Sequence, residues 1–291
     1  MKKISALLII LSGILWGLMG VFSNALNSIG FTSIQGSAIR IILCALMLTA
    51  INFKYLKIEF KDIWKFALIG IFSILTMSTT YFESIRRSSL TLASILLYTA
   101  PVMVMVMSAV FYKEKITPKK LLCLVGAIVG IIMISGIDSK VKLSKAGLMY
   151  GLLSAFSYAL YSIIGKMILK KYSPVTVSTY AFIFASIGVL FICNIPQIVK
   201  ISCNSAGVFY TFAIMAGCAL VTAAIPYTLY TLGLKYVPAG TASVLACVEP
   251  LTATVIGISF YGDKLGIISF IGIILIFMAV GFLSFSNKKE S

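Results

Sequence analysis

A single carboxylate stands in the middle of a long apolar run, VLACVEPLTATVIG, at residues 244–257. The carboxylate belongs to Glu249, and the next residue is Pro250. Within a membrane, an ionisable side chain marks a substrate or ion pathway or a proton relay. Proline removes a backbone hydrogen bond and bends a helix, and the freed carbonyl must be satisfied by protein or water. The pair therefore predicts a bent helix that lines a polar cavity, with Glu249 facing that cavity.

Two other roles for Glu249 remain open at this level. The carboxylate could form a structural ion pair with a buried base, and Arg40 and Lys166 are the basic residues that fall clearly within apolar runs. It could also exchange a proton during transport, which would couple the movement of a solute to a proton gradient. We assign Arg40 to a buried charge with a structural role. Lys166 lies near the end of its run, where its side chain could reach water.

Polar and aromatic residues recur at helical spacing in the other apolar runs. A cavity that they line would suit a small amphipathic solute, whereas a strongly anionic solute would need more buried bases. The tyrosines could instead anchor helix ends at the membrane surface, and the small residues near them could serve packing. The candidates for the substrate cavity are Trp16, Asn24, Thr76, Thr80, Tyr98, Tyr158, Tyr161, Tyr227 and Glu249. The candidates for helix bends are Pro101, Pro226 and Pro250.

The composition excludes several kinds of chemistry. The chain contains no histidine, which excludes His-based catalytic triads, HExxH zinc sites and histidine general bases. Its six cysteines are scattered and do not indicate a disulfide framework. We therefore expect no enzymatic activity, no cofactor and no metal site.

The elements that must position these residues are helices within a membrane. Of the 291 residues, 60% are hydrophobic and 11% are charged, against roughly 45–50% and about 25% in soluble domains. Runs of about 20 apolar residues, each long enough to cross a bilayer as a helix, recur along the chain. This pattern predicts an all-α integral membrane protein. We predict ten spans, at residues 5–26, 33–53, 64–82, 90–112, 119–137, 146–167, 174–195, 207–233, 239–261 and 264–285.

The charge distribution predicts an orientation for these spans. The net charge of +16 would suggest a nucleic-acid partner in a soluble protein, but here the positive-inside rule explains it better. Of the 24 Lys and Arg residues, fifteen fall on the side of the termini, seven fall on the opposite side, and Arg40 and Lys166 fall within spans. We therefore expect a multi-pass protein of the inner or plasma membrane, with both termini in the cytoplasm and no nucleic-acid partner.

The two halves of the chain repeat each other. When Pro101 is aligned with Pro250, the segment TLASILLYTAPVMVMVMSAVFYKEK at 91–115 matches GTASVLACVEPLTATVIGISFYGDK at 240–264 without a gap. Each half holds five predicted spans. Because five is odd, two consecutive copies must cross the bilayer in opposite senses, which is a recurring plan of secondary transporters. We predict two inverted five-helix repeats, at residues 1–137 and 138–291.

These features together resemble the drug/metabolite transporter superfamily, in its ten-helix branch with two EamA-type domains. The resemblance covers nearly the whole chain. Each motif is weak by itself, but motifs recur in the same order in the two halves. Its residues are Trp16 and Gly17, Arg40, Pro101, the pair Glu249 and Pro250, and the turns Glu114-Lys115 and Asp263-Lys264. The resemblance implies that the first, third, fourth, sixth, eighth and ninth helices line a central cavity.

The sequence and the resemblance lead to one functional expectation with alternatives. We expect a secondary transporter that moves a small organic solute by alternating access, and the resemblance favours efflux of an amino acid or related metabolite. An uncoupled facilitator and a multidrug-type exporter of small amphipathic compounds are the alternatives. A channel fits less well, because Glu249 has no equivalent carboxylate in the first half and would not form a matching polar ring. The partners expected are the solute and the lipid bilayer, with the chain acting as a monomer or a homodimer.

Overall fold

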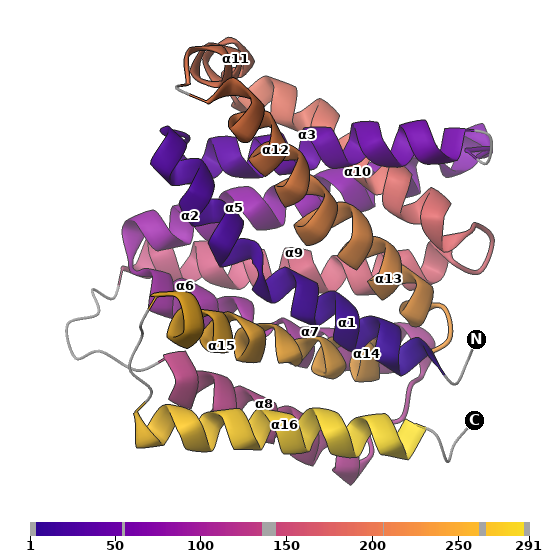
Figure 1. The fold of residues 1–291 in the computed structure, drawn as a ribbon. Helices are drawn as coiled ribbons and strands as arrows, with labels where there is room; N and C mark the ends of the chain where they lie inside the picture. The colour runs from indigo at the N-terminus through magenta and orange to yellow at the C-terminus, as the bar shows by residue number, and fades with distance from the viewer. Residues whose placement is uncertain (1–3, 54–55, 136–143, 206, 262–265, 288–291) are drawn as a thin grey trace.

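The computed structural model describes residues 4–53, 56–135, 144–205, 207–261 and 266–287, and these residues form helices joined by short connections. The helices are arranged as a single bundle (Figure 1). The first half holds α1 (Ser5–Gly17), α2 (Met19–Ile29), α3 (Ser33–Asn52), α4 (Ile63–Ala67), α5 (Thr76–Arg87), α6 (Leu90–Leu97), α7 (Ala100–Tyr112) and α8 (Pro118–Ser135). The second half holds α9 (Lys145–Ile168), α10 (Pro174–Ile192), α11 (Ile195–Asn204), α12 (Val208–Ala219), α13 (Ile225–Leu234), α14 (Ala239–Leu245), α15 (Glu249–Tyr261) and α16 (Ile267–Asn287).

The ten predicted spans are confirmed within the described residues. Nine helical stretches are long and apolar enough to cross a membrane, and the tenth, Ile267–Leu283, is a shorter apolar helix. Several spans contain two of these helices. The first span, Ser5–Ile29, for example, contains α1 and α2. The first span begins and the last span ends at the same end of the bundle (Figure 1), which we call the termini end.

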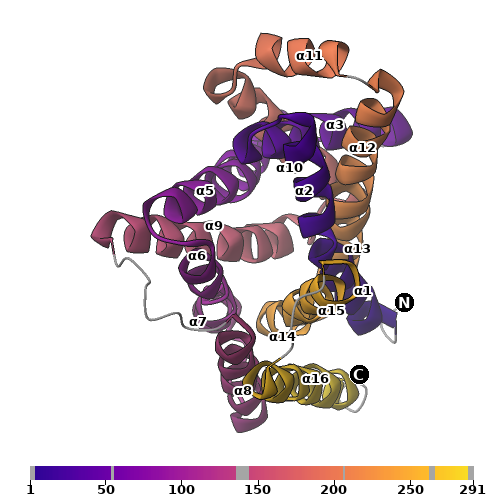
Figure 2. The same cartoon turned by 60° about the vertical axis from the view of Figure 1, so that its left-hand side comes forward.

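The packing follows the symmetry of two inverted repeats. Three pairs join equivalent spans of the two halves: α3 with α10, α7 of the fourth span with α14 of the ninth, and α8 with α16. Two further pairs, α1 with α13 and α5 with α9, exchange places when the repeats are exchanged. Figure 2 shows α8 and α16 side by side at one edge of the bundle and α3 and α10 toward the other. The fold is therefore an all-α membrane fold of ten helices in two inverted repeats.

The α8–α16 pair shows how closely equivalent helices approach. A β-carbon at Gly130 would lie 2.7 Å from the backbone oxygen of Gly272, and one at Gly272 would lie 2.6 Å from the backbone oxygen of Gly130. Small residues let membrane helices approach until their backbones touch. The reciprocal contact therefore fixes this edge of the bundle.

Among the described residues, five spans are interrupted, each at positions inside the span rather than at its ends. The first span breaks at Leu18, the third contains a π-helical segment, Leu68–Leu75, and the fourth breaks at Tyr98 and Thr99. The eighth contains a second π-helical segment, Leu220–Ala224, and the ninth a 3₁₀ turn, Ala246–Val248. Such interruptions often mark functional sites. By contrast, α9 runs without interruption for 24 residues.

One helix was not predicted. The connection after the seventh span contains α11, Ile195–Asn204, which lies outside the main bundle (Figure 2). Its start is fixed locally, because the Asn194 side chain accepts a hydrogen bond from the backbone of Gln197 at 3.1 Å and Pro196 occupies the first turn. Asparagine caps and first-turn prolines both favour helix initiation. A ten-residue helix is too short to cross the bilayer, so a pattern of long apolar runs does not predict it.

Candidate functional site

Aromatic rings from three spans meet at the centre of the bundle. The ring of Trp16 in α1 lies 5.1 Å from that of Tyr227 and 5.4 Å from that of Tyr230, both in α13. Tyr161 in α9 packs edge-on against Tyr227 at 5.1 Å, and Tyr158 lies 6.4 Å from Trp16. Edge-to-face packing of this kind holds aromatic rings in defined orientations. We call these five residues the aromatic cluster.

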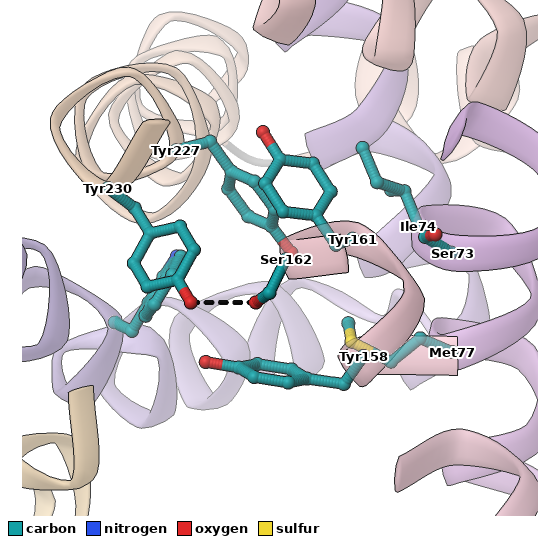
Figure 3. Close-up of a pocket in the computed structure, with 9 residues that line it drawn as sticks. Ser73, Ile74, Met77, Tyr158, Tyr161, Ser162, Tyr227 and Tyr230 are labelled. Atoms are coloured by element: carbon teal, nitrogen blue, oxygen red, sulfur yellow. Dashed lines mark hydrogen bonds between the residues drawn. The ribbon is translucent and has the colours of Figure 1, made fainter. Parts of the chain in front are cut away.

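The aromatic cluster borders a cavity with an empty volume of about 260 Å³ (Figure 3). Beyond the aromatic cluster, its lining consists of Ser73, Ile74, Met77 and Ser162. The Tyr230 hydroxyl and the Ser162 hydroxyl lie 2.7 Å apart and share a hydrogen bond. Trp16 Nε1 and Ser73 Oγ are buried and have no hydrogen-bond partner among the described residues. These two polar atoms are therefore available to a solute or to water.

A second cavity, with an empty volume of about 280 Å³, contains Glu249. Its lining comes from the interrupted fourth and ninth spans and from Tyr158, which also borders the first cavity. The Tyr98 side chain lies close to the Glu249 carboxylate in this lining. Three aligned pairs of the repeat line this cavity, namely Leu97 with Ala246, Tyr98 with Cys247, and Ala100 with Glu249. The cavity therefore lies where the two repeats meet.

The backbone around Glu249 follows from Pro250. Proline has no N–H to donate to the carbonyl four residues back, which is that of Ala246. Instead, the backbone N–H of Glu249 donates to the Ala246 carbonyl and closes the 3₁₀ turn. Glycines of α1 allow close packing against this turn, since a β-carbon at Gly13 would lie 2.9 Å from the Ala246 oxygen and one at Gly17 2.7 Å from the Glu249 oxygen. The first span thus holds the segment that presents the carboxylate.

The other proline candidates also begin helical segments. Pro101 lies in the first turn of α7, directly after the break at Tyr98 and Thr99. Pro226 lies in the first turn of α13 and follows the π-helical segment Leu220–Ala224. Each proline thus stands where its span changes geometry.

Neither of the two buried basic residues, Lys166 and Arg40, forms an ion pair with Glu249. Lys166 forms an ion pair with Glu114, with Nζ 3.0 Å from Oε1, and donates to the carbonyl of Val237 at 2.8 Å. Arg40 Nη1 lies 3.4 Å from the carbonyl of Thr222 and donates to it. Among the ion pairs of the described residues, none includes Glu249. The structure therefore gives no support to the interpretation of Glu249 as one half of a structural ion pair.

Glu114 joins three spans at the termini end. Besides pairing with Lys166, it accepts hydrogen bonds from the backbone N–H groups of Ala239 and Gly240, at 3.0 and 3.4 Å. These amides open α14, so the carboxylate caps that helix. Burial alone would raise the pKa of Glu114, but the charge of Lys166 and the amide donors outweigh it, and its pKa lies below the usual value.

The predicted cavity residues do not all lie together. Trp16, Tyr158, Tyr161 and Tyr227 border the first cavity, while Tyr98, Tyr158 and Glu249 border the second. The Thr76 hydroxyl instead donates to the Ile71 carbonyl at 2.9 Å, and the Thr80 hydroxyl to the Thr76 carbonyl at 2.7 Å. Asn24 is exposed on α2. These last three side chains are not part of either cavity lining.

Several lining residues were not among the candidates. Tyr230 and Ser162 border the first cavity, and each has a helical spacing that could have indicated it. Tyr230 follows Tyr227 by three residues, and Ser162 follows Tyr158 by four, so each pair shares a helix face. Met77 also borders the cavity, but a methionine in an apolar run carries no comparable signal. Among the described residues, no group of three or more His, Cys, Asp or Glu side chains is placed to hold a metal ion.

Comparison with known proteins identifies similar chains. The model of the EamA-like transporter family matches twice, at residues 3–136 and 145–285. A protein of Archaeoglobus fulgidus named "Uncharacterized transporter" is 29% identical over 204 residues, which is 70% of each chain. YwfM of Bacillus subtilis, an "Uncharacterized transporter", is 23% identical over 99% of this chain and 96% of its own. The "Uncharacterized inner membrane transporter YicL" of Salmonella typhimurium is 21% identical over 97% and 96%.

A solved structure shares the fold. A chain titled "Crystal structure of protein" superposes with a TM-score of 0.79, covering 99% of this chain and 100% of its own. Its sequence identity is 14%, so the likeness concerns the fold alone. It shows that the ten-helix arrangement of the bundle is one that an experimentally determined chain also adopts.

Proposed function

Since this chain belongs to the EamA-like transporter family, we propose that it is a secondary transporter that carries a small organic solute with a cationic amino group. Amino acids and related amine metabolites are the solutes that fit. The observation that carries this proposal is the Glu249 carboxylate, which has no ion-pair partner among the described residues and adjoins the aromatic cluster through Tyr158.

The chemistry of the two cavities suits an ammonium group. A carboxylate at membrane depth is costly unless a partner or water compensates its charge, and a positively charged solute would supply that partner. Aromatic faces add cation–π attraction, which is strongest for Trp. The remaining walls of the first cavity, Ile74 and Met77, are apolar and would accept a hydrocarbon side chain. A solute that is both amphipathic and cationic therefore matches the lining.

The architecture supports alternating access as the mechanism. The interrupted spans border the cavities, and interrupted helices at a repeat interface are the usual site of binding in inverted-repeat transporters. We place the termini end in the cytoplasm of a cell with an inner or plasma membrane, because the positive-inside rule favours that orientation. Glu114, Lys166 and the start of α14 then close the cytoplasmic end. Net movement of solute outward is the direction that we propose.

Counterflow into liposomes tests the proposal. Purified protein is reconstituted, and uptake of labelled neutral amino acids and of their decarboxylated amines is measured against an internal pool of the same solute. We expect saturable counterflow in the wild type and a loss of about 100-fold in Glu249→Gln, because a charge-assisted contact contributes about 1.5–3 kcal/mol. Glu83→Gln is the matched control, since Glu83 pairs with Arg86 and Arg87 at the end of α5. Equal flux in the two variants would contradict the role of Glu249.

Proton exchange is the coupling that we propose, because Glu249 can release a proton when the solute binds and regain one afterwards. An imposed pH gradient separates this mechanism from facilitated diffusion. A coupled wild-type carrier accumulates solute against its gradient when the pH differs across the membrane. A wild type that equilibrates solute without accumulating it, at any pH difference, would instead be an uncoupled facilitator.

A further inference from the structure

Arg40 carries a buried charge that forms no ion pair with any of the described residues. Its side chain lies in α3 and the residue is 3% exposed. Nη1 donates to the Thr222 carbonyl at 3.4 Å and lies 3.4 Å from Met19 Sδ, both neutral acceptors. Nε is buried and has no hydrogen-bond partner in the described part of the chain. Because a buried unpaired charge is strongly unfavourable, this guanidinium calls for an anion.

The contact to Thr222 explains only part of this arrangement. Pro226 cannot donate to the carbonyl four residues back, which is that of Thr222, so Arg40 supplies the missing hydrogen bond. A neutral donor would satisfy that carbonyl equally well. The hydrogen bond between α3 and the π-helical segment Leu220–Ala224 therefore requires neither the positive charge nor Nε, which has no partner among the described residues.

Arg40 borders a cavity of its own, with an empty volume of about 300 Å³. Its polar lining comes from Ser23, Asn27, Ser33 and Ser37. The Ser37 hydroxyl is buried and, like Arg40 Nε, has no partner among the described residues. A guanidinium with hydroxyl and amide donors around it has the chemistry that binds a carboxylate.

This cavity lies close to the proposed solute site. Met19, which touches Arg40, follows Trp16 by three residues across the break at Leu18. Tyr227 of the aromatic cluster lies within electrostatic range of both Arg40 and Glu249. Arg40 and Glu249 also lie within electrostatic range of each other, so the ammonium and carboxylate groups of one solute could contact both.

We propose that Arg40 and the hydroxyl groups beside it form a binding subsite for the carboxylate of the transported solute. The inference rests on the proposed function and deepens it: the solute is a zwitterionic amino acid with an apolar side chain. Its ammonium group binds at Glu249, its carboxylate at Arg40, and its side chain against the aromatic cluster.

Equilibrium binding followed by tryptophan fluorescence tests the subsite. The chain has two tryptophans, and Trp64 is 55% exposed, so Trp64→Phe leaves Trp16 as the sole reporter beside the cavity. The probes are L-leucine with 3-methylbutylamine, which lacks the carboxylate, and 4-methylpentanoate, which lacks the amine. L-Phenylalanine with 2-phenylethylamine is a second pair. We expect the amino acid to bind at least about tenfold more tightly than its amine.

Variants at Arg40 separate recognition from folding. In Arg40→Gln the amide can still donate to the Thr222 carbonyl but the charge is gone, and we expect the ratio between amino acid and amine to fall to about one. Arg40→Lys should restore part of the ratio, because it restores the charge. If Arg40 is merely structural, Arg40→Gln lowers thermal stability but leaves the ratio unchanged in the folded protein, which would overturn the proposal.

The remaining outcomes distinguish this inference from the proposed function. If the wild type binds the amine as tightly as the amino acid, the carboxylate subsite is wrong while an amine carrier stands. If it binds 4-methylpentanoate but not the amine, and Arg40→Gln abolishes that binding, the subsite stands and the amine proposal fails. Replacing gluconate by chloride tests whether the cavity holds an inorganic anion. If chloride raises the thermal stability of the wild type but not of Arg40→Gln, and both proteins show the same ratio of affinities for amino acid and amine, the proposal is overturned.

Discussion

The fourth and ninth spans break at equivalent positions, yet they bring different chemistry to the same cavity. In the first repeat, Ala100 and Pro101 follow a break at Tyr98 and Thr99. In the second repeat, Glu249 and Pro250 follow a 3₁₀ turn. The first break supplies a phenol, through Tyr98, and the second supplies the carboxylate that it contacts. Inverted repeats thus share a backbone plan, while the recognition that we propose depends on residues that the repeats do not share.

The strongest test of this comparison moves the carboxylate from the ninth span to the equivalent position in the fourth span. Glu249→Ala should reduce counterflow about 100-fold, because the charge-assisted contact to the solute is lost. The double variant Ala100→Glu with Glu249→Ala places a carboxylate at the equivalent position of the first break. We expect it to remain inactive, since Tyr98 and the packing of Gly17 hold the carboxylate only on the second break. Rescue of counterflow by the double variant would show that the two breaks are interchangeable.

The support that α1 gives to the ninth span should produce the next largest effect. A β-carbon at Gly17 would lie 2.5 Å from Thr252 Cβ and 2.7 Å from the Glu249 oxygen, so Gly17→Ala forces the two helices apart. Overpacking of this kind costs about 1–3 kcal/mol, and we expect lower thermal stability together with about tenfold weaker solute binding. Gly20→Ala is the matched control, because nothing lies within 4 Å of a β-carbon there. Equal stability of both variants would argue against the close approach.

Tyr98 and Cys247 occupy aligned positions in the two repeats and line the same cavity, which allows a finer comparison. Tyr98→Phe removes the hydroxyl that contacts Glu249, and we expect solute binding to weaken by about fivefold to tenfold. Cys247→Ala should change binding less than about threefold, because the thiol is a weak donor and already donates to the carbonyl of Ser243, at 3.5 Å. Binding measured by Trp16 fluorescence separates the two variants. A larger loss in Cys247→Ala would reverse the roles that we assign to the breaks.

Much of the fold could be read from the sequence, because membrane spans depend on composition and length. The aligned prolines revealed the repeat, and the isolated carboxylate of Glu249 pointed to a cavity. Contacts between distant segments could not be predicted in this way. Arg40 donates to the backbone carbonyl of Thr222, 182 residues away. Because every residue has a backbone carbonyl, residue types do not indicate which carbonyl accepts this hydrogen bond. The same limit applies to Thr76 and Thr80, whose hydroxyls satisfy carbonyls of their own helix.

Which polar residues reach a cavity also depends on backbone geometry that residue types do not fix. The π-helical segment Leu68–Leu75 shifts the register of the third span, and Ser73 and Met77 rather than Thr76 border the first cavity. At the repeat position of Lys166, Asn24 is exposed, whereas Lys166 pairs with Glu114. The segments WGLMGVFSN at 16–24 and YALYSIIGK at 158–166 resemble each other weakly at an offset of 142, which predicts a polar residue at each place but not its environment.

The smallest effect that we predict concerns Glu114, which ties the termini end together. Its folded-state pKa lies below the usual value, so its contribution to stability is present above the unfolded pKa and is lost as the pH falls through the folded pKa. With an ordinary glutamate pKa near 4.3, the contribution should be complete above about pH 5 and decline below about pH 4. Glu114→Gln should lower the free energy of unfolding by about 1–2 kcal/mol at pH 7. Thermal unfolding of both proteins from pH 7 to pH 3.5 measures this, and the difference should shrink in acid. A constant difference across that range would mean that the charge of Glu114 does not stabilise the termini end, and that the shape of its side chain alone matters.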